Sequence, residues 1–125
     1  MKIAYQGVAG SYSESCAKKM YPESETIPCK TFDECFERSS KDNSIKSLIP
    51  ESNKTTGNIG VEYLIFKYRL NIYAEHFFPI NHNLLGLKDS KIEEIKDVYS
   101  HAQALSQSSS FIKKKKFIEN VRADT

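Results

Sequence analysis

The stretch KIAYQGVAGSYSE, residues 2–14, decides the fold class of this chain. Residues 2–5 form a short apolar run that is typical of a β-strand, and the two glycines that follow predict a turn. Ser11 and Glu14 then have the Ser-x-x-Glu spacing of a capping box, which predicts a helix that ends before Pro22. A strand, a glycine loop and a helix in this order begin a βαβ unit.

The alternation of strand and helix continues to the end of the chain. Apolar patterning predicts further strands at residues 27–29, 47–50, 70–78, 82–87, 98–99 and 117–121. Capping boxes predict helix starts at Thr31/Glu34, Ser90/Glu93 and Ser100/Gln103, and an apolar stripe predicts a helix within residues 59–68. We expect the polar stretch 51–56 to be a loop. This alternation predicts an α/β fold with a largely parallel sheet.

Composition excludes several classes of protein. The 125 residues suit one domain, and 18 basic against 16 acidic residues leave a net charge of +2, which argues against a nucleic-acid partner. No apolar run approaches the roughly 18–20 residues of a membrane span, so we expect no membrane partner. The three cysteines are odd in number and lack Cys-x-x-Cys spacing, which argues against a disulfide framework or a structural zinc site. We therefore expect a reduced, cytoplasmic protein.

Three loops follow predicted strands and open helices, at residues 6–13, 50–57 and 100–103. Helix N-termini present free N–H groups and the positive end of the helix dipole, so converging loops would suit carboxylates or phosphates. The alternative is that each hydroxyl only caps its own helix, and for Ser11 we favour the cap.

Other motifs point less clearly to chemistry. The Gly7-x-x-Gly10 pair matches neither a dinucleotide fingerprint nor a phosphate loop. His76, His82 and His101 lack metal-ligand spacing, and only His101, at a helix start, is placed to face the loops. The cysteines fit apolar patterns, which favours burial over a Cys–His nucleophile. The basic run at residues 113–116 is typical of a solvated helix end.

Several segments together resemble one known family in order and in spacing. They are residues 3–7 with 10–14, 31–36, 49–50 with Asn53 and 57–60, 78–86, 98–107, and the pair Asp124-Thr125. The family is that of the prephenate dehydratases, and the resemblance covers the whole chain.

The resemblance implies a fold like that of type II periplasmic binding proteins, with two α/β lobes and a ligand cleft between them. Residues 1–76 would form the first lobe, and residues 77–125 would begin a second lobe within which the chain is truncated. It also implies a hydro-lyase of L-phenylalanine biosynthesis that converts prephenate, a small dicarboxylate, to phenylpyruvate, CO2 and water. Neither a metal nor an organic cofactor is implied.

The site residues carried over from the family come from all three loops. The implied catalytic residues are Asn53, Ser100 and Gln107. The implied substrate-binding residues are Gln6, Gly7, Gly10, Ser11 and His101.

This chain also departs from the family pattern. Ser52 and Lys54 replace a glutamate and a serine, Glu51 is the nearest acid, and Ala102 replaces a proline. The Thr-Arg-Phe motif, whose threonine is the family's catalytic acid, is absent from the 125 residues. We therefore expect the chain alone to be inactive or nearly so. Two alternatives remain: a non-catalytic module that binds carboxylates, and a fragment that folds only by pairing with a second copy. Sheet edges without partners would favour a homo-oligomer.

Overall fold

The computed structural model describes residues 1–53 and 57–122. The chain divides into two compact units, Met1–Ile80 and Asn81–Thr125, and each is described by itself. The sequence placed the boundary between the two expected lobes after residue 76, and the correspondence between lobes and units stays a prediction. The described residues do not include Lys54, which departs from the family pattern, or the pair Asp124-Thr125, which resembles it.

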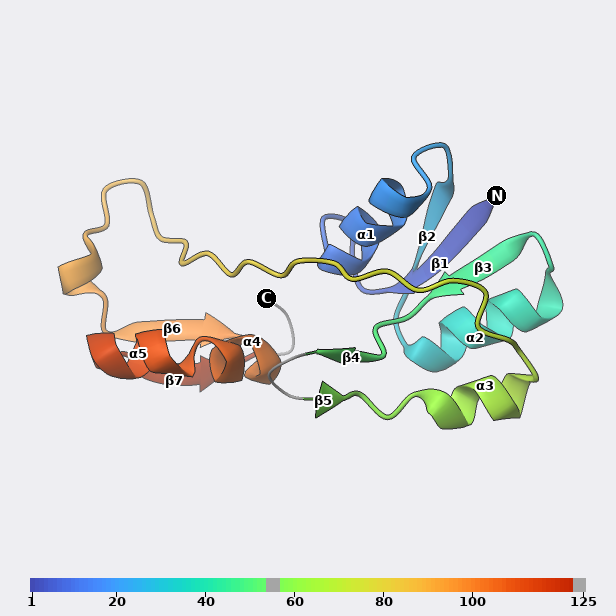
Figure 1. The fold of residues 1–125 in the computed structure, drawn as a ribbon. Helices are drawn as coiled ribbons and strands as arrows, with labels where there is room; N and C mark the ends of the chain where they lie inside the picture. Colours follow the sequence, from blue (N-terminus) through green and yellow to red (C-terminus); the bar gives the residue numbers. More distant parts are fainter. Residues whose placement is uncertain (54–56, 123–125) are drawn as a thin grey trace. The chain divides into compact units, whose positions relative to one another are not determined.

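Unit 1 is built on a three-stranded sheet (Figure 1). Its strands are β1 (Lys2–Gln6), β2 (Glu25–Cys29) and β3 (Ile45–Leu48), in the order β2-β1-β3. Both pairings are parallel, and they align Ala4 with Ile27 on one side and with Ser47 on the other. The α/β class with a parallel sheet is therefore confirmed.

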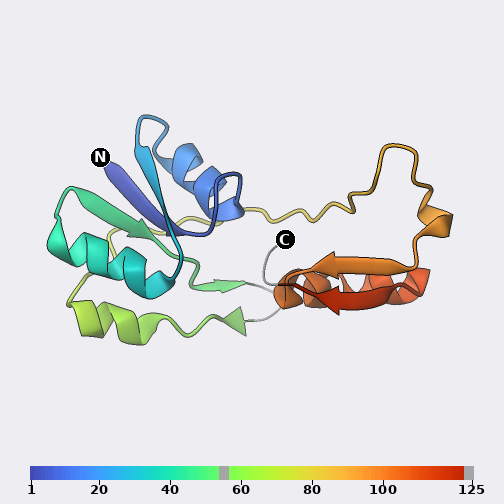
Figure 2. The same cartoon turned by 180° about the vertical axis from the view of Figure 1, so that it is seen from behind.

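Two helices cover this sheet, and a third packs against one of them. They are α1 (Tyr12–Met20), α2 (Phe32–Lys41) and α3 (Glu62–Tyr68), and the views from the front and from behind place α1 on one face and α2 on the other, with α3 beside α2 (Figures 1 and 2). Because side chains alternate along a strand, β1 buries Ile3 and Tyr5 toward one face and Ala4 toward the other. The central strand thus has both faces covered, as a parallel sheet requires.

The core on the α2 face joins two clusters of apolar side chains. One contains Ala4, Cys29 and Cys35, and the other contains Phe36, Val61 and Leu64. Three apolar side chains of α2, Phe32, Cys35 and Phe36, lie in these clusters. The stripe expected through residues 59–68 is confirmed, although α3 itself begins only at Glu62.

The segment between α3 and η1, the 3-10 helix Ile92–Glu94, corrects two predictions, because it contains no strand at residues 70–78 or 82–87. Its residues alternate in polarity as strands do, but among the described residues its backbone joins no ladder, and Phe77 and Leu85 are 86% and 87% exposed. The part of the segment that belongs to unit 1 packs on that unit through side chains: the Phe78 ring lies 6.4 Å from that of Tyr12, and Lys46 Nζ lies 5.8 Å from the Tyr73 ring centre. Alternation without a partner strand is insufficient to form a strand.

The polar stretch expected to be a loop at residues 51–56 contains part of a small antiparallel pair. This pair consists of β4 (Ser52–Asn53) and β5 (Gly57–Asn58), with Asn53 opposite Gly57. The positive φ of 76° at Gly57 is a conformation that glycine adopts readily.

Unit 2 is a second parallel unit. β6 (Asp97–Ser100) leads into α4 (Ala102–Gln107) and α5 (Ser109–Lys115), and β7 (Ile118–Val121) pairs parallel to β6. Its core consists of Val98, Leu105, Ile112 and Phe117, with Ile92 and Ile95 packed against it. The strands expected at residues 98–99 and 117–121 are confirmed. Instead of one helix, however, the chain forms two that meet at Ser108.

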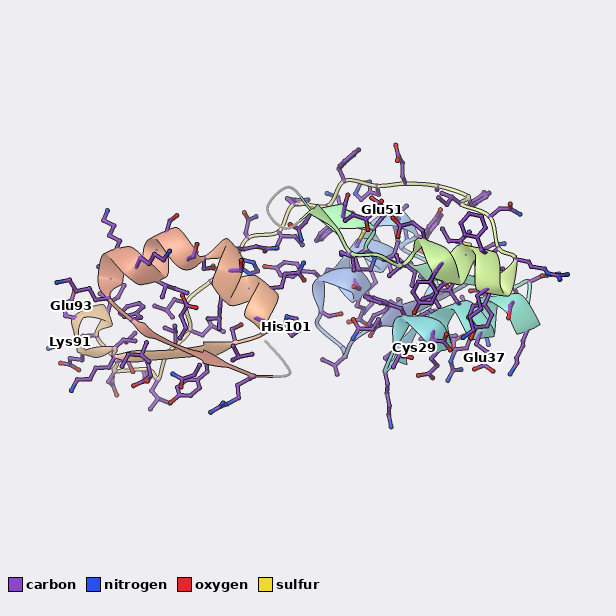
Figure 3. The ribbon with its side chains drawn as sticks, turned by 90° about the horizontal axis from the view of Figure 1, so that it is seen from below. Cys29, Glu37, Glu51, Lys91, Glu93 and His101 are labelled. Atoms are coloured by element: carbon purple, nitrogen blue, oxygen red, sulfur yellow. The ribbon has the colours of Figure 1, made fainter. Side chains whose placement is uncertain are left out.

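The expected capping box at Ser90 and Glu93 is wrong. The turn that forms there is η1, and it starts after Lys91 without a side-chain cap (Figure 3). Of the helices in residues 1–53 and 57–122, none has the length and apolarity needed to cross a bilayer.

Candidate functional site

The candidate residues of unit 1 lie where its strands end. In a parallel sheet all strands end at the same edge, so the loop that follows β1 and the segment that follows β3 leave the sheet together. Gln6, half-buried, ends β1 opposite Cys29 of β2. Gly7 N–H donates to the Cys29 carbonyl at 3.0 Å, which ties the start of the loop to β2.

Two glycines shape the loop between β1 and α1. Gly7 and Gly10 have φ values of +128° and +88°, which side chains with a Cβ rarely adopt. Gly7 is also crowded, because a Cβ placed there would lie 3.2 Å from Ser11 Oγ. The turn predicted from these glycines is confirmed, and it brings Gln6, Gly7, Gly10 and Ser11 into one short loop at the start of α1.

Ser11 is the N-cap of α1, as favoured from the sequence. Its Oγ accepts a hydrogen bond from Glu14 N–H at 3.3 Å. The hydroxyl proton is not used in that bond, so Ser11 can cap the helix and still donate to a ligand.

Glu14 has a larger part in this loop than a capping residue usually has. Its carboxylate accepts from Gly10 N–H at 2.7 Å and from Thr26 Oγ1 at 3.1 Å, and it pairs with Lys18 Nζ at 2.9 Å. The Gly10 hydrogen bond first, and then the hydrogen bond from Lys18, lower the pKa of Glu14 to about 2. Its side chain is only 12% exposed. The carboxylate therefore stays ionised and connects the loop to both α1 and β2.

The loop between β2 and α2 repeats this arrangement. Thr31 Oγ1 accepts from Glu34 N–H at 3.1 Å, and the Glu34 carboxylate accepts from Lys30 N–H at 2.9 Å. The hydrogen bonds from Arg38 and from Lys30 lower the pKa of Glu34. Two helices of nine and ten residues thus begin at one edge of the sheet, each with an ionised glutamate in its first turn.

Asn53, half-buried, belongs to β4, in the segment that leaves β3 at that edge. The adjacent acid Glu51 lies at the start of this hairpin (Figure 3): its carbonyl accepts from Ile59 N–H at 2.8 Å, and its carboxylate accepts from Asn58 Nδ2 at 3.5 Å. Asn58 also donates to Glu62, which lowers the pKa of that carboxyl.

The candidate residues of unit 2 lie at the two ends of α4. Ser100 is the last residue of β6, and its carbonyl accepts from Arg122 N–H at 2.9 Å. The helix cap expected at Ser100 is wrong: His101 is the N-cap, and its Nδ1 accepts from Gln103 N–H at 3.3 Å (Figure 3). This difference arises because Ser100 remains within the strand, in register with Val121 of β7.

Gln107 is the last residue of α4. A helix of six residues is about 9 Å long, so Gln107 stands that far along the helix from His101. Its Oε1 lies 2.6 Å from Nε2 of His82, a residue that the sequence did not identify as part of a site.

The structure also identifies a cation that the sequence analysis missed. Arg122 follows β7, and its guanidinium lies 4.9 Å from the centre of the Tyr99 ring. Because β6 and β7 are parallel, Arg122 and Ser100 end neighbouring strands at the same edge of unit 2. The capping-box spacing identified Glu14 only as a helix-start residue. Its contact with Thr26 and the place of Arg122 beside Ser100 depend on the paired strands.

Other kinds of site have less support. Within the described residues, no group of three or more His, Cys, Asp or Glu side chains is placed to hold a metal ion. The three cysteines are buried free thiols, and burial raises the pKa of Cys16 and Cys35, which makes both poor nucleophiles. A shallow recess of about 520 Å³ between Ile65 and Ile72 is mostly apolar and contains no candidate residue.

Comparison with known proteins gives a consistent family. Residues 3–125 match the family model described as prephenate dehydratase. Arogenate dehydratase 2 of Petunia hybrida is 39% identical over 126 residues, which cover 100% of this chain and 32% of the relative. Arogenate dehydratase/prephenate dehydratase 1 of Arabidopsis thaliana, described as chloroplastic, is 41% identical over 108 residues, covering 86% and 28%. The chain thus spans about a third of the length of these relatives.

Two solved structures share the fold. The prephenate dehydratase of Staphylococcus aureus subsp. aureus Mu50 has a TM-score of 0.74 at 24% identity, over 98% of this chain and 47% of that one. A structure described as GqqA, a novel type of quorum quenching acylases, has a TM-score of 0.77 at 27% identity, over 100% and 46%.

Proposed function

Because the chain belongs to the prephenate dehydratase family, we propose that it takes part in the conversion of prephenate to phenylpyruvate, CO2 and water. The match of residues 3–125 to that family carries the proposal. The family is one of hydro-lyases. Since the chain spans about a third of its curated relatives, the activity of the whole protein is itself part of the proposal.

The chemistry of prephenate suits the groups at the two strand edges. One ring carbon bears a carboxylate and the side chain that carries the second carboxylate, and the opposite ring carbon bears the hydroxyl that leaves. Loss of the ring carboxylate as CO2 and of the hydroxyl as water makes the ring aromatic. A protein therefore has mainly to orient the ring and to protonate the hydroxyl. Both tasks call for hydrogen-bond donors, and neither requires a cofactor.

In this proposal Gln6 and Ser11 bind a carboxylate through their side chains, and Gly7 and Gly10 shape the loop that presents them. The backbone N–H groups of Gly7, Gly10 and Ser11 already donate to protein acceptors. The pairing of Lys18 with Glu14 at 2.9 Å offsets the negative charge that would otherwise repel such a ligand. Asn53 contributes a side-chain amide from the same edge of unit 1.

Unit 2 contributes Ser100, His101 and Gln107. The proposed catalytic residues, which contact the reacting groups, are Ser100, Gln107 and Asn53. His101 uses Nδ1 as the helix cap, so its neutral ring has the N–H on Nε2 and can donate a hydrogen bond from it. Arg122 adds positive charge beside Ser100.

The two-lobed fold implied by the family and the cytoplasmic location both remain predictions.

The substrate is prephenate or arogenate, since the relatives are named for one or both. Arogenate has an amine where prephenate has its side-chain ketone. We test the proposal by titrating the chain with each compound near neutral pH and following backbone amide signals by NMR. We expect signals of the 6–11 loop and of Ser100 to shift, and Asn53→Ala and Ser100→Ala each to weaken binding about tenfold. Ser40→Ala, on exposed α2 surface, is the matched control.

Turnover is measured separately, as phenylpyruvate formed above a control without protein, because prephenate also decomposes spontaneously. We expect none from these 125 residues, since a missing general acid typically costs about 10² to 10⁴ in rate. Binding of either compound without turnover, even by a longer form of the protein, would favour the non-catalytic carboxylate-binding module. Failure of both compounds to bind at millimolar concentration would refute the proposal. Cleavage of an N-acyl amide would instead indicate an acylase, the activity named in the description of one structure that shares the fold.

The expected homo-oligomer is part of this proposal. The outer edges of β2 and β3 pair with no other strand in the described residues, and such edges recruit partners. At a protein concentration on the order of tens of micromolar, sedimentation is expected to show a species larger than the 14.3 kDa chain. A single monomeric species would exclude self-association.

A further inference from the structure

Within unit 2, a residue far from Gln107 in the sequence contacts its side chain directly. His82 Nε2 and Gln107 Oε1 are 2.6 Å apart, although 25 residues separate them. His82 belongs to the long segment without helix or strand, whereas Gln107 ends α4.

The atoms involved determine how the amide of Gln107 is oriented. An amide oxygen only accepts hydrogen bonds, so Nε2 of His82 must carry the proton and donate it. The NH2 group, on the other branch of the same amide, keeps both N–H bonds for other acceptors. Carboxylate and hydroxyl oxygens are suitable acceptors for these donors.

The backbone around Gln107 is held by neighbours on both sides. Leu105 and Ile112 are both 4% exposed within one cluster, and Ser108 N–H donates to the Ala104 carbonyl at 3.0 Å. The side chain has three rotatable bonds of its own, however, and this backbone support does not select one rotamer. The hydrogen bond to His82 selects one rotamer of the Gln107 side chain.

We propose that His82 is a positioning residue for Gln107, holding the amide so that its NH2 group is presented to the ligand. The role rests on the proposed function, in which Gln107 contacts the substrate. The hydrogen bond itself does not depend on that function, so it can be tested without a ligand.

The first experiment reads the two side chains by NMR. At a pH where the imidazole is neutral, nitrogen correlations are expected to show His82 protonated on Nε2. His82→Ala is expected to move the side-chain amide signals of Gln107, whereas His76→Ala, which removes an exposed histidine of unit 1, should leave them in place. Protonation of His82 on Nδ1, or Gln107 signals unchanged in His82→Ala, would overturn the proposal.

The second experiment measures prephenate binding in a double-mutant cycle. We expect His82→Ala to weaken binding about three- to tenfold and His82→Gln, which restores an N–H donor, to recover most of the loss. In a Gln107→Ala background His82→Ala should have no further effect. Additive effects would overturn the positioning role. If the unmodified chain binds neither prephenate nor arogenate, the proposed function fails and the positioning role falls with it, while the NMR result still decides whether the hydrogen bond exists.

Discussion

Glu14 reaches back past its own helix cap to Gly10, whose backbone N–H donates to the carboxylate at 2.7 Å. In a standard capping box the glutamate would bond to the N–H of the cap itself, here Ser11, but that group donates to the Val8 carbonyl at 3.2 Å. Glu34 reaches back to Lys30 in the same way at 2.9 Å. The two helices that start at the carboxyl edge of the unit 1 sheet are thus held to their preceding loops by equivalent carboxylates.

The first prediction concerns the acid stability of this arrangement. Since hydrogen bonding lowers the pKa of Glu14 from 4.5 to about 2, its ionised form stabilises the fold above pH 4.5. That contribution is lost progressively as the pH falls from about 4.5 toward 2. Urea unfolding between pH 6 and 3 should therefore show a smaller loss of unfolding free energy in Glu14→Gln than in the unmodified chain.

Glu37→Gln, which removes an exposed ion pair with Lys41, controls for the change of one charge. A Glu14 carboxyl that titrates near 4.5 by NMR would contradict the prediction.

The second prediction tests how the loop depends on Gly7. Gly7→Ala forces a Cβ to a φ of +128° and to 3.2 Å from Ser11 Oγ, whereas Gly10→Ala meets no atom within 4 Å at its φ of +88°. We expect Gly7→Ala to destabilise the chain by about 1–3 kcal/mol, and Gly10→Ala by less. Thermal and urea unfolding compare the two variants. Equal effects would mean that the contact with Ser11 carries no cost.

The third prediction concerns a hydrogen-bond chain between β3 and α2. Ser47 Oγ donates to the Cys35 carbonyl at 2.7 Å and lies 2.6 Å from Oγ of Ser39, which is buried. Ser47→Ala leaves the buried Ser39 hydroxyl without this partner, so we expect a loss of about 1–3 kcal/mol in unfolding free energy. Ser40→Ala, which removes an exposed hydrogen bond to Glu37, should change it by less than about 0.5 kcal/mol. Similar losses in the two variants would refute this account.

The fourth prediction compares two apolar residues of α3. Leu64 is 1% exposed and Phe66 is 81% exposed. Leu64→Ala should cost about 2–5 kcal/mol because it leaves a cavity between α2 and α3. Phe66→Ala should cost about 0.5 kcal/mol or less, as measured by urea unfolding. If Phe66→Ala proved the more damaging, the exposed face of α3 would have to be covered in solution.

Much of unit 1 could be predicted from the sequence because its determinants are local. The caps at Ser11 and Thr31 each depend on a backbone N–H three residues away, and the buried face of α2 follows from apolar residues three and four apart. The candidate loop residues Gln6, Gly7, Gly10 and Ser11 could be placed together for the same reason. Nothing in that spacing indicated the hydrogen bond between Glu14 and Thr26, because it depends on how β2 lies beside β1.

The sequence by itself determined the strands and helices from β1 to α2 and the glycine turn, since each depends on residues within a few positions of one another. It also determined the family, through matching segments spread along the whole chain. Only the tertiary structure decided that the alternating residues 70–78 remain unpaired, that Ser100 stays in β6 while His101 caps α4, and that His82 meets Gln107. Each of these outcomes depends on hydrogen bonds between segments far apart in the chain. A strand forms only where a second strand supplies the matching donors and acceptors, and a local pattern cannot specify that partner.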